Sequence, residues 1–554
     1  MSVLMRHKFS SGVLALALSA LVLSGCTPPQ TSKQSEAASV SQSKIENPAP
    51  FGWSLPEISA AVQSGELSSS ELVAAYLARI EAVDRAGPQL QSILTLNLDA
   101  MNQAKALDAE LVAGNSRGPL HGIPILVKDN IETRDPMPTT AGSTALQNNL
   151  NHRDAPLIAN LREAGAVILG KTNLSQWANF RSNASISGWS ALGGQTRNPH
   201  ILDRSPCGSS AGSGVAVAAF LTSGAIGTET NGSISCPSAR NGIVGFKPTV
   251  GLVSQRLIIP ISSTQDTAGP MTLSVEGAAL MLDGMTGRSG EQSFTRLLKK
   301  SALDGKRIGV LRFAQGKIPA IQDRFEKALL VLEEAGAVLI DIDTYEPPKS
   351  FWDDSFAVLQ WEFKETLNAY LAGTSEQVKT RSLAELIAFN QVEREIEQSL
   401  FDQDVFEMSE ARTGLDDPEY LKALNLVLTA TRQDGIDRIL GENQLDLLVA
   451  PTGAPAFLID PVFGDGFPGG NTGGGWMAAI AGYPHLTVPM GSISALPVGI
   501  SFMGAAGQDA EVLAAGYAYE IRSAKRVIPQ FLPSADAVPS VQKAFMRRPR
   551  PASE

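Results

Sequence analysis

Short apolar runs alternate with segments of helical periodicity along most of the chain, and this alternation most constrains the fold. Residues 123–127 and 166–169 are typical of buried strands, and residues 155–164 between them have the spacing of a helix. The same order recurs later, with strand-like residues 307–311 and 337–340 on either side of a helical segment at 325–335. Apolar runs of strand length that alternate with helices predict an α/β layer fold.

The first 50 residues differ in composition from the rest of the chain and are interpreted as a targeting signal followed by a linker. Arg6, His7 and Lys8 precede an apolar run over residues 13–23, which is too short to span a bilayer and is typical of a secretory signal. The run ends Leu23-Ser24-Gly25-Cys26, which resembles the lipobox of bacterial lipoproteins. We therefore expect residues 1–25 to be a lipoprotein signal peptide and Cys26 to be acylated, the alternative being an ordinary signal peptide.

Residues 26–50 are rich in Ser, Gln, Lys, Glu and Pro and predict a flexible linker. The expected location is the bacterial cell envelope, either facing the periplasm or at the cell surface. The membrane would be contacted by the lipid anchor alone.

Composition excludes several classes of protein. Lys plus Arg is 45 and Asp plus Glu is 56, a net charge of −11, which argues against a nucleic-acid partner bound through a broad basic surface. Three cysteines are too few for a disulfide scaffold. The five histidines form no H-E-x-x-H pair, and the Gly-rich loop at 464–475 lacks the phosphate-binding G-x-x-x-x-G-K-[ST] pattern. We expect no metal and no cofactor.

Residues 190–255 are dominated by Gly, Ser, Ala, Thr and Asn, which favours tight turns with backbone N–H groups facing a ligand. Residues 205–214 contain a G-x-S-x-G string centred on Ser210. This string is found at the nucleophile of α/β-hydrolases, for which Asp460 and His485 could complete a triad. An esterase that uses Ser210 is therefore one alternative.

A second serine motif, Gly227-Thr228-Glu229-Thr230-Asn231-Gly232-Ser233, follows about 24 residues after the first. The two motifs, with Val127-Lys128-Asp129-Asn130 upstream and Asp266-Thr267-Ala268-Gly269-Pro270 downstream, resemble the amidase signature family. The resemblance covers residues 51–532. It implies a single large domain with a central twisted mixed sheet flanked by helices, and it leaves residues 533–554 as a disordered tail.

The resemblance also implies a role for each matching residue. Ser233 corresponds to the nucleophile, Ser209 to a serine that follows a cis peptide and relays the proton, and Lys128 to the base. Ser210 is expected to support Lys128 through a hydrogen bond. The loop that stabilises the oxyanion, and binds substrate through its backbone N–H groups, corresponds to Thr230, Asn231, Gly232 and Ser233.

These roles are chemically reasonable for the residue types. A serine hydroxyl becomes a good nucleophile only when a base removes its proton, and a lysine can be that base only as a neutral amine. Its ordinary pKa is about 10.4, so we expect burial to lower it. Cys207 and Cys236 stand beside the two serine motifs. We interpret them as unpaired, buried thiols, although a disulfide is conceivable in an exported protein.

Two departures from the family pattern narrow the range of expected substrates. The nucleophile motif begins with Glu229 where the family usually has Asp, and Ser235 stands where an Arg is common. The loss of that cation argues against a substrate carboxylate held there. Together with residues 177–181 and 187–190, these variants resemble bacterial peptide amidases. The prediction is a serine amidase that cleaves a small-molecule or peptide amide, such as a C-terminal peptide amide, to acid plus ammonia or amine through an acyl-serine. An inactive lipoprotein that only binds ligands is the other alternative.

Overall fold

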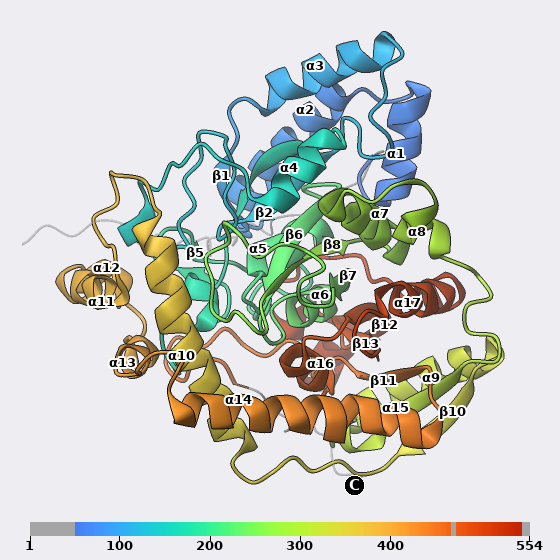
Figure 1. Cartoon of the computed structure of the whole chain (residues 1–554). Coiled ribbons are helices and arrows are strands. Elements are labelled where there is room, and N and C mark those ends of the chain that lie inside the picture. The colour runs from blue at the N-terminus through green and yellow to red at the C-terminus, as the bar shows by residue number, and fades with distance from the viewer. Residues whose placement is uncertain (1–49, 467–471, 546–554) are drawn as a thin grey trace, which may run out of the picture. The chain divides into compact units, whose positions relative to one another are not determined.

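An eleven-stranded sheet forms the centre of the fold in the computed structural model, which describes residues 50–466 and 472–545 (Figure 1). In spatial order its strands are β1 (Ile93–Leu96), β3 (Val167–Thr172), β2 (Pro124–Lys128), β6 (Gly224–Glu229), β8 (Thr267–Thr272), β7 (Val244–Lys247), β12 (His485–Ile493), β13 (Leu496–Met503), β11 (Leu447–Pro451), β9 (Arg307–Leu311) and β10 (Val338–Ile342). A separate two-stranded hairpin pairs β4 (Trp189–Ser190) with β5 (Gly194–Gln195).

The sheet is mixed, as the family resemblance implies. Strand β2 runs parallel to both β3 and β6, and β9 runs parallel to β10 and β11. The strands between these groups pair antiparallel, including β12 with β13. All residues of β2, β3 and β6 are buried. Because both faces of these strands are covered, their sequences are runs of mostly apolar or small residues and do not alternate with polar ones.

Helices flank the sheet and form three groups. In one group, α7 (Val275–Thr286), α9 (Pro319–Glu334) and α17 (Asp509–Ser523) pack with β8 or β12. Three further helices of this group pack on α7: α1 (Leu55–Ser64), α4 (Pro156–Glu163) and α8 (Phe294–Leu297). A second group packs with the strands nearest the serine motifs: α5 (Ala211–Ala218), α6 (Ser235–Asn241) and α16 (Gly475–Ala481). Near the N-terminus, α2 (Ser69–Arg79) packs on α3 (Ala100–Val112), and Ser68 caps α2 through a reciprocal capping box with Glu71.

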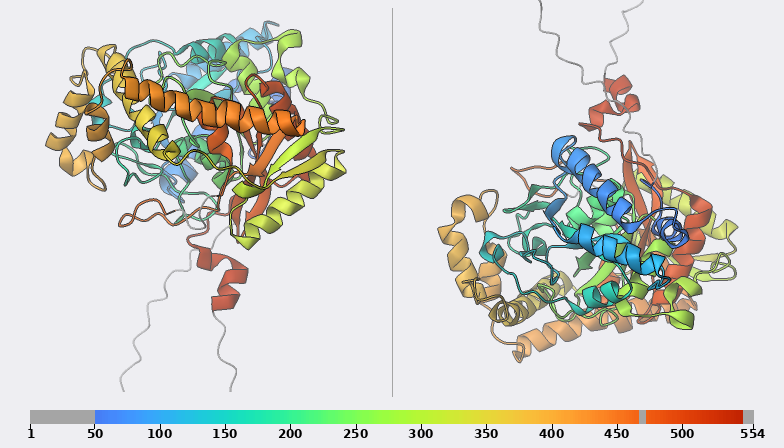
Figure 2. Two further views of the ribbon diagram at one scale, coloured as in Figure 1. Left: turned by 60° about the horizontal axis from the view of Figure 1, so that its bottom comes forward. Right: turned by 90° about the horizontal axis from the view of Figure 1, so that it is seen from above.

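A third group of helices lies beside the sheet (Figure 2). It consists of α10 (Phe351–Ala372), α11 (Leu383–Val392), α12 (Arg394–Glu397), α13 (Asp404–Glu410), α14 (Pro418–Thr431) and α15 (Asp437–Asn443). The sequence indicates one helix over residues 418–440, but a π-helical turn at Arg432–Ile436 separates α14 from α15. Gly435 is non-helical there (φ −104°, ψ −112°), and this interrupts the helix.

The described part of the C-terminal segment corrects the prediction of a disordered tail from residue 533. Ala535–Ala537 forms a 3₁₀ turn and Pro539–Phe545 forms α18. Val538 is buried in a small apolar cluster with Leu532 and Ile201, which holds this stretch against the domain. The predicted signal peptide, the acylation site at Cys26 and the linker to residue 49 lie outside the described residues. Over the described ranges, no helix combines the length and apolarity that crossing a membrane requires.

Candidate active site

The sheet brings Lys128 and the second serine motif together. Lys128 is the last residue of β2, and Glu229 ends the parallel neighbour β6. Because adjacent parallel strands end at the same edge of a sheet, the loop at residues 230–233 begins beside the lysine. Ser209 comes just before α5, and the Ser210 N–H donates to the Ser233 carbonyl (3.1 Å), so both serine motifs meet at this edge.

Lys128 is fully buried and hydrogen-bonded to both motifs. Its Nζ lies 2.7 Å from Ser209 Oγ, 2.8 Å from Thr228 Oγ1 and 3.3 Å from the Thr228 carbonyl. Burial lowers the pKa of Lys128 to about 7, although the carboxylates of Asp266 and Glu229 act to raise it. The expected neutral amine is therefore well populated at neutral pH. The peptide bond between Gly208 and Ser209 is cis, as the family resemblance implies.

Two carboxylates hold the loop that carries Ser233. Glu229 Oε2 accepts hydrogen bonds from the N–H groups of Ile234 (2.8 Å) and Ser235 (2.9 Å) at the start of α6. Asp266 Oδ1 accepts one from Thr230 Oγ1 (2.5 Å). Gly232 has φ +88°, a left-handed conformation that favours glycine, although there is room for a side chain. The turn that presents Ser233 therefore depends on this glycine.

Sequence reasoning assigned no role to Thr228 or Asp266, although both lie within the quoted motifs. It also gave Ser210 the wrong partner. Ser210 Oγ donates to the Thr228 carbonyl (3.1 Å) and accepts from the Thr228 N–H (3.2 Å), so it supports the lysine's neighbour and not the lysine. Ser209 and Ser210 are neighbours in sequence, but Ser209 contacts the amine of Lys128 and Ser210 contacts Thr228. The amino-acid composition of the segment does not indicate which of the two serines faces the lysine.

The triad that the esterase alternative needs is not assembled. His485 Nε2 is hydrogen-bonded to Ser501 Oγ at 2.7 Å, and Asp460 Oδ1 accepts from the backbone of Val462 and Phe463. Ser210 makes its hydrogen bonds with Thr228 instead. The G-x-S-x-G string is thus a feature of a Gly- and Ser-rich segment and does not mark a nucleophile here.

Cys207 and Cys236 form a disulfide, so their interpretation as unpaired thiols is wrong. The bond joins the segment two residues before Ser209 to the helix that starts after Ser233, with Cα atoms 6.0 Å apart. The two cysteines are 29 residues apart in sequence. The fold places them face to face because the two serine motifs meet at one sheet edge, a contact that spacing alone does not reveal.

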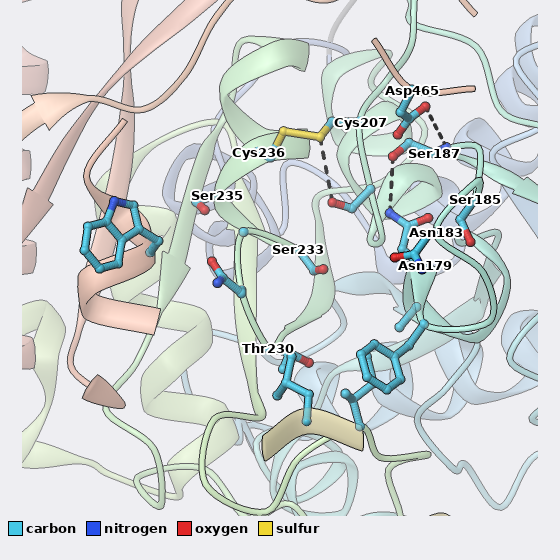
Figure 3. Close-up of a pocket in the computed structure, with 18 of the residues that line it drawn as sticks. Asn179, Asn183, Ser185, Ser187, Cys207, Thr230, Ser233, Ser235, Cys236 and Asp465 are labelled. Carbon is cyan, nitrogen blue, oxygen red and sulfur yellow. Dashed lines mark hydrogen bonds between the residues drawn. A yellow bond between two sulfur atoms is a disulfide. The ribbon is translucent and has the colours of Figure 1, made fainter. Parts of the chain in front are cut away.

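A cavity of about 620 Å³ opens over the Ser233 loop (Figure 3). Figure 3 shows Asn179, Asn183, Ser185, Ser187 and Asp465 gathered on one side of Ser233. The Ser187 N–H donates to Asp465 Oδ1 (3.0 Å), and Asn179 Nδ2 donates to Ser187 Oγ (3.2 Å). The Gly-rich loop, which the sequence indicates as a rim or lid, lines this cavity with its described residues Gly464, Asp465, Thr472, Gly473 and Gly475.

Arg181 holds in place the segment that carries Asn179 and Asn183 on the polar side of the cavity. Its guanidinium lies over the ring of Phe401 (4.2 Å) and near that of Trp189 (5.6 Å), and it donates to Gln176 Oε1 (2.7 Å). It also donates to the carbonyl of Phe401 (3.1 Å). A buried guanidinium needs such partners, and here they connect the cavity wall to the helices of the third group.

The sequence pattern of the family described as Amidase matches residues 71–513. The α/β sheet carries a buried lysine, a serine that follows a cis peptide beside it, and a second serine on the adjacent loop. This arrangement is that of a serine hydrolase with a lysine in place of histidine. The chain belongs to the amidase signature family, and it is an amidase.

Individual relatives agree with this assignment. The native peptide amidase from Stenotrophomonas maltophilia is 47% identical, with a TM-score of 0.80 over 87% of this chain and 99% of that chain. A structure of the peptide amidase PAM with the competitive inhibitor chymostatin is also 47% identical, with a TM-score of 0.81 over 86% and 99% of the two chains. A probable amidase of Arabidopsis thaliana is 35% identical over 547 residues, which cover 95% of this chain and 98% of the relative.

Proposed function

We propose that this amidase is exported and hydrolyses the C-terminal amide of peptides to a free acid and ammonia through an acyl-Ser233 intermediate. The observation that carries the proposal is the contact of 2.7 Å between Lys128 Nζ and Ser209 Oγ in a fully buried setting, next to the loop that exposes Ser233 to a cavity.

The proton moves along this contact. Ser233 Oγ attacks the amide carbonyl while its proton passes to Ser209, whose own proton passes to neutral Lys128. Backbone N–H groups of residues 230–233 stabilise the oxyanion. The lysine then returns the proton through Ser209 to the leaving nitrogen, and the C–N bond breaks to give ammonia and acyl-Ser233. Water hydrolyses the ester by the same relay, which frees the acid and restores the serine.

The charge of the cavity supports a neutral amide as substrate. Among the described residues that line it, Asp465 is the one carboxylate and there is no lysine or arginine. Ser235, which takes the place of the usual arginine, lines the cavity as well. A neutral carboxamide avoids repulsion from Asp465, whereas the carboxylate product meets no lysine or arginine among the described lining residues that would retain it. The peptide-like inhibitor bound by the similar peptide amidase supports a peptide as the acyl group.

Release of ammonia tests the proposal. Purified protein is incubated with peptides that end in an amide, with matched N-terminally blocked esters and with aryl amides, and ammonia is measured together with the mass of the acid product. We expect ammonia from the peptide amides and none after Ser233→Ala. Activity confined to esters, or unchanged ammonia release from the Ser233→Ala variant, would contradict the proposal.

Export and lipid anchoring are part of the same proposal. They depend on the signal-like residues 1–25 and on Cys26, and the Cys207–Cys236 disulfide supports them because such bonds persist in oxidising compartments. In a bacterial host, Cys26→Ser should prevent acylation and shift the protein out of the membrane fraction. A wild-type protein with an unmodified Cys26 in the soluble fraction would refute the anchor.

A further inference from the structure

Trp476 brings an aromatic surface to the catalytic cavity. It is the second residue of α16 and lines the same cavity as Ser233. Its ring centroid lies 4.9 Å from that of Trp352 and 5.4 Å from that of Phe351, and Tyr345 lies 6.0 Å away. Three aromatic rings therefore hold this indole from outside the cavity, because none of the three is among the described residues that line it.

Two of the rings that support Trp476 come from the start of α10. Phe351 is fully buried at the start of α10, whereas Trp352 is 49% exposed. Both belong to one helix, so the position of the Trp476 ring is set by α10 as well as by its own helix α16. An indole held in this way loses little conformational freedom when a ligand packs on it, which makes it a favourable binding surface.

The rest of the cavity has the composition of a peptide site. Phe356 and Leu359, also from α10, line it with Val405 of α13 and add apolar surface. The polar side chains beside Asp465 form a separate part of the wall (Figure 3). Apolar surface with a few converging polar groups suits a ligand that combines an apolar side chain with a peptide backbone.

We propose that Trp476 determines substrate specificity by binding a large apolar side chain, aromatic or branched aliphatic, on the amidated residue of the peptide. This inference rests on the proposed peptide-amide function. Stacking on an indole adds to the burial of the apolar side chain itself, so wild-type kcat/KM should favour such amides over a glycine amide by roughly 10-fold to 100-fold.

The substrate series is the first test. Blocked dipeptides Ac-Ala-Xaa-NH₂, with Gly, Ala, Leu or Phe as the amidated residue, are compared by ammonia release from the full protein. We expect kcat/KM to rise from Gly to Phe. Equal turnover of all four would overturn the inference but leave the proposed function in place, whereas no turnover of any of them would overturn the proposed function itself.

Two variants assign the preference to Trp476. Trp476→Ala should lower kcat/KM for the Phe amide by roughly 10-fold or more and leave the Gly amide within about 2-fold, while Trp476→Phe restores most of the preference. Trp352→Ala removes one of the rings that hold Trp476 but leaves the proposed binding surface, because Trp352 is not among the described residues that line the cavity. It should weaken the preference less than Trp476→Ala does. If Trp476→Ala lowers all four amides equally, or leaves the preference for Phe over Gly unchanged, direct binding by Trp476 is refuted.

Discussion

Removing the charge of Asp266 should move the pH dependence of the enzyme to lower pH. Burial lowers the pKa of Lys128 to about 7, and Asp266 is the first of the two carboxylates that oppose this shift. With a pKa of about 7, half of the lysine is neutral at pH 7, whereas a pKa of 10.5 would leave about 1 molecule in 3,000 active. Wild-type kcat/KM should therefore fall about tenfold per pH unit below 7 and level off above it.

Asp266→Asn isolates the electrostatic effect because it preserves the shape of the side chain. The amide oxygen can still accept from the N–H groups of Ile261 and Ser262, which now lie 2.7 and 2.9 Å from Asp266 Oδ2. Since the lost negative charge had stabilised the ammonium form of Lys128, the midpoint of the kcat/KM profile should shift to lower pH.

Profiles of kcat/KM from pH 5.5 to 9, measured with one peptide amide, test this shift. Asp283→Asn is the control, because Asp283 is also buried with a raised pKa but does not act on Lys128. Its profile should match the wild type. A wild-type kcat/KM that still rises about tenfold per pH unit at pH 9, or an Asp266→Asn midpoint at or above the wild-type value, would refute the assignment of Lys128 as the base.

Three further predictions concern the residues around the lysine. Ser209→Ala should reduce kcat by several orders of magnitude because it cuts the proton relay. Ser210→Ala loses two hydrogen bonds to the Thr228 backbone and none to the lysine, so it should reduce kcat by less than about tenfold; steady-state kinetics compares the two variants. Cys207→Ser should lower the melting temperature, since a disulfide that closes a loop of 29 residues contributes ~3–4 kcal/mol, and equal melting of oxidised and reduced wild type would contradict this. The folded pKa of Lys128 lies below its unfolded value of 10.5, so between about pH 7 and 10.5 the unfolded state binds more protons and wild-type stability gains ~5 kcal/mol with rising pH. The Lys128→Met variant should lack this gain when the free energy of unfolding is measured in urea. An identical pH dependence in both proteins would show that the pKa of Lys128 is not lowered in the folded state.

The candidate site residues could be located because each lies in a short motif that resembles the amidase signature family. Lys128 ends a run of five buried strand residues, and the Ser233 turn needs a glycine at position 232, which the motif contains. Short-range patterns of this kind follow from strand burial and backbone conformation. The α/β class and most helices could be anticipated for the same reason, whereas the mixed sheet is implied only by the family resemblance.

Contacts between distant segments could not be derived in this way. Asp266 reaches the oxyanion loop because β8 pairs with β6, and Cys207 meets Cys236 because both serine motifs end at one edge of the sheet. Trp476 enters the cavity only through the packing of α16 near α14 and α10. Such contacts depend on the tertiary arrangement, which the helix and strand propensities of the individual residues do not determine. The burial of Val538 similarly depends on a cluster that includes Ile201, more than 300 positions earlier.

The identity of the nucleophile is the central claim, and covalent labelling tests it most directly. A fluorophosphonate reacts quickly only with a serine whose proton is removed by a base, so the wild-type protein should gain one adduct. Peptide mapping by mass spectrometry should place that adduct on Ser233, and Ser233→Ala should remain unlabelled. An adduct on Ser210, or full labelling and full amide hydrolysis in Ser233→Ala, would contradict the mechanism.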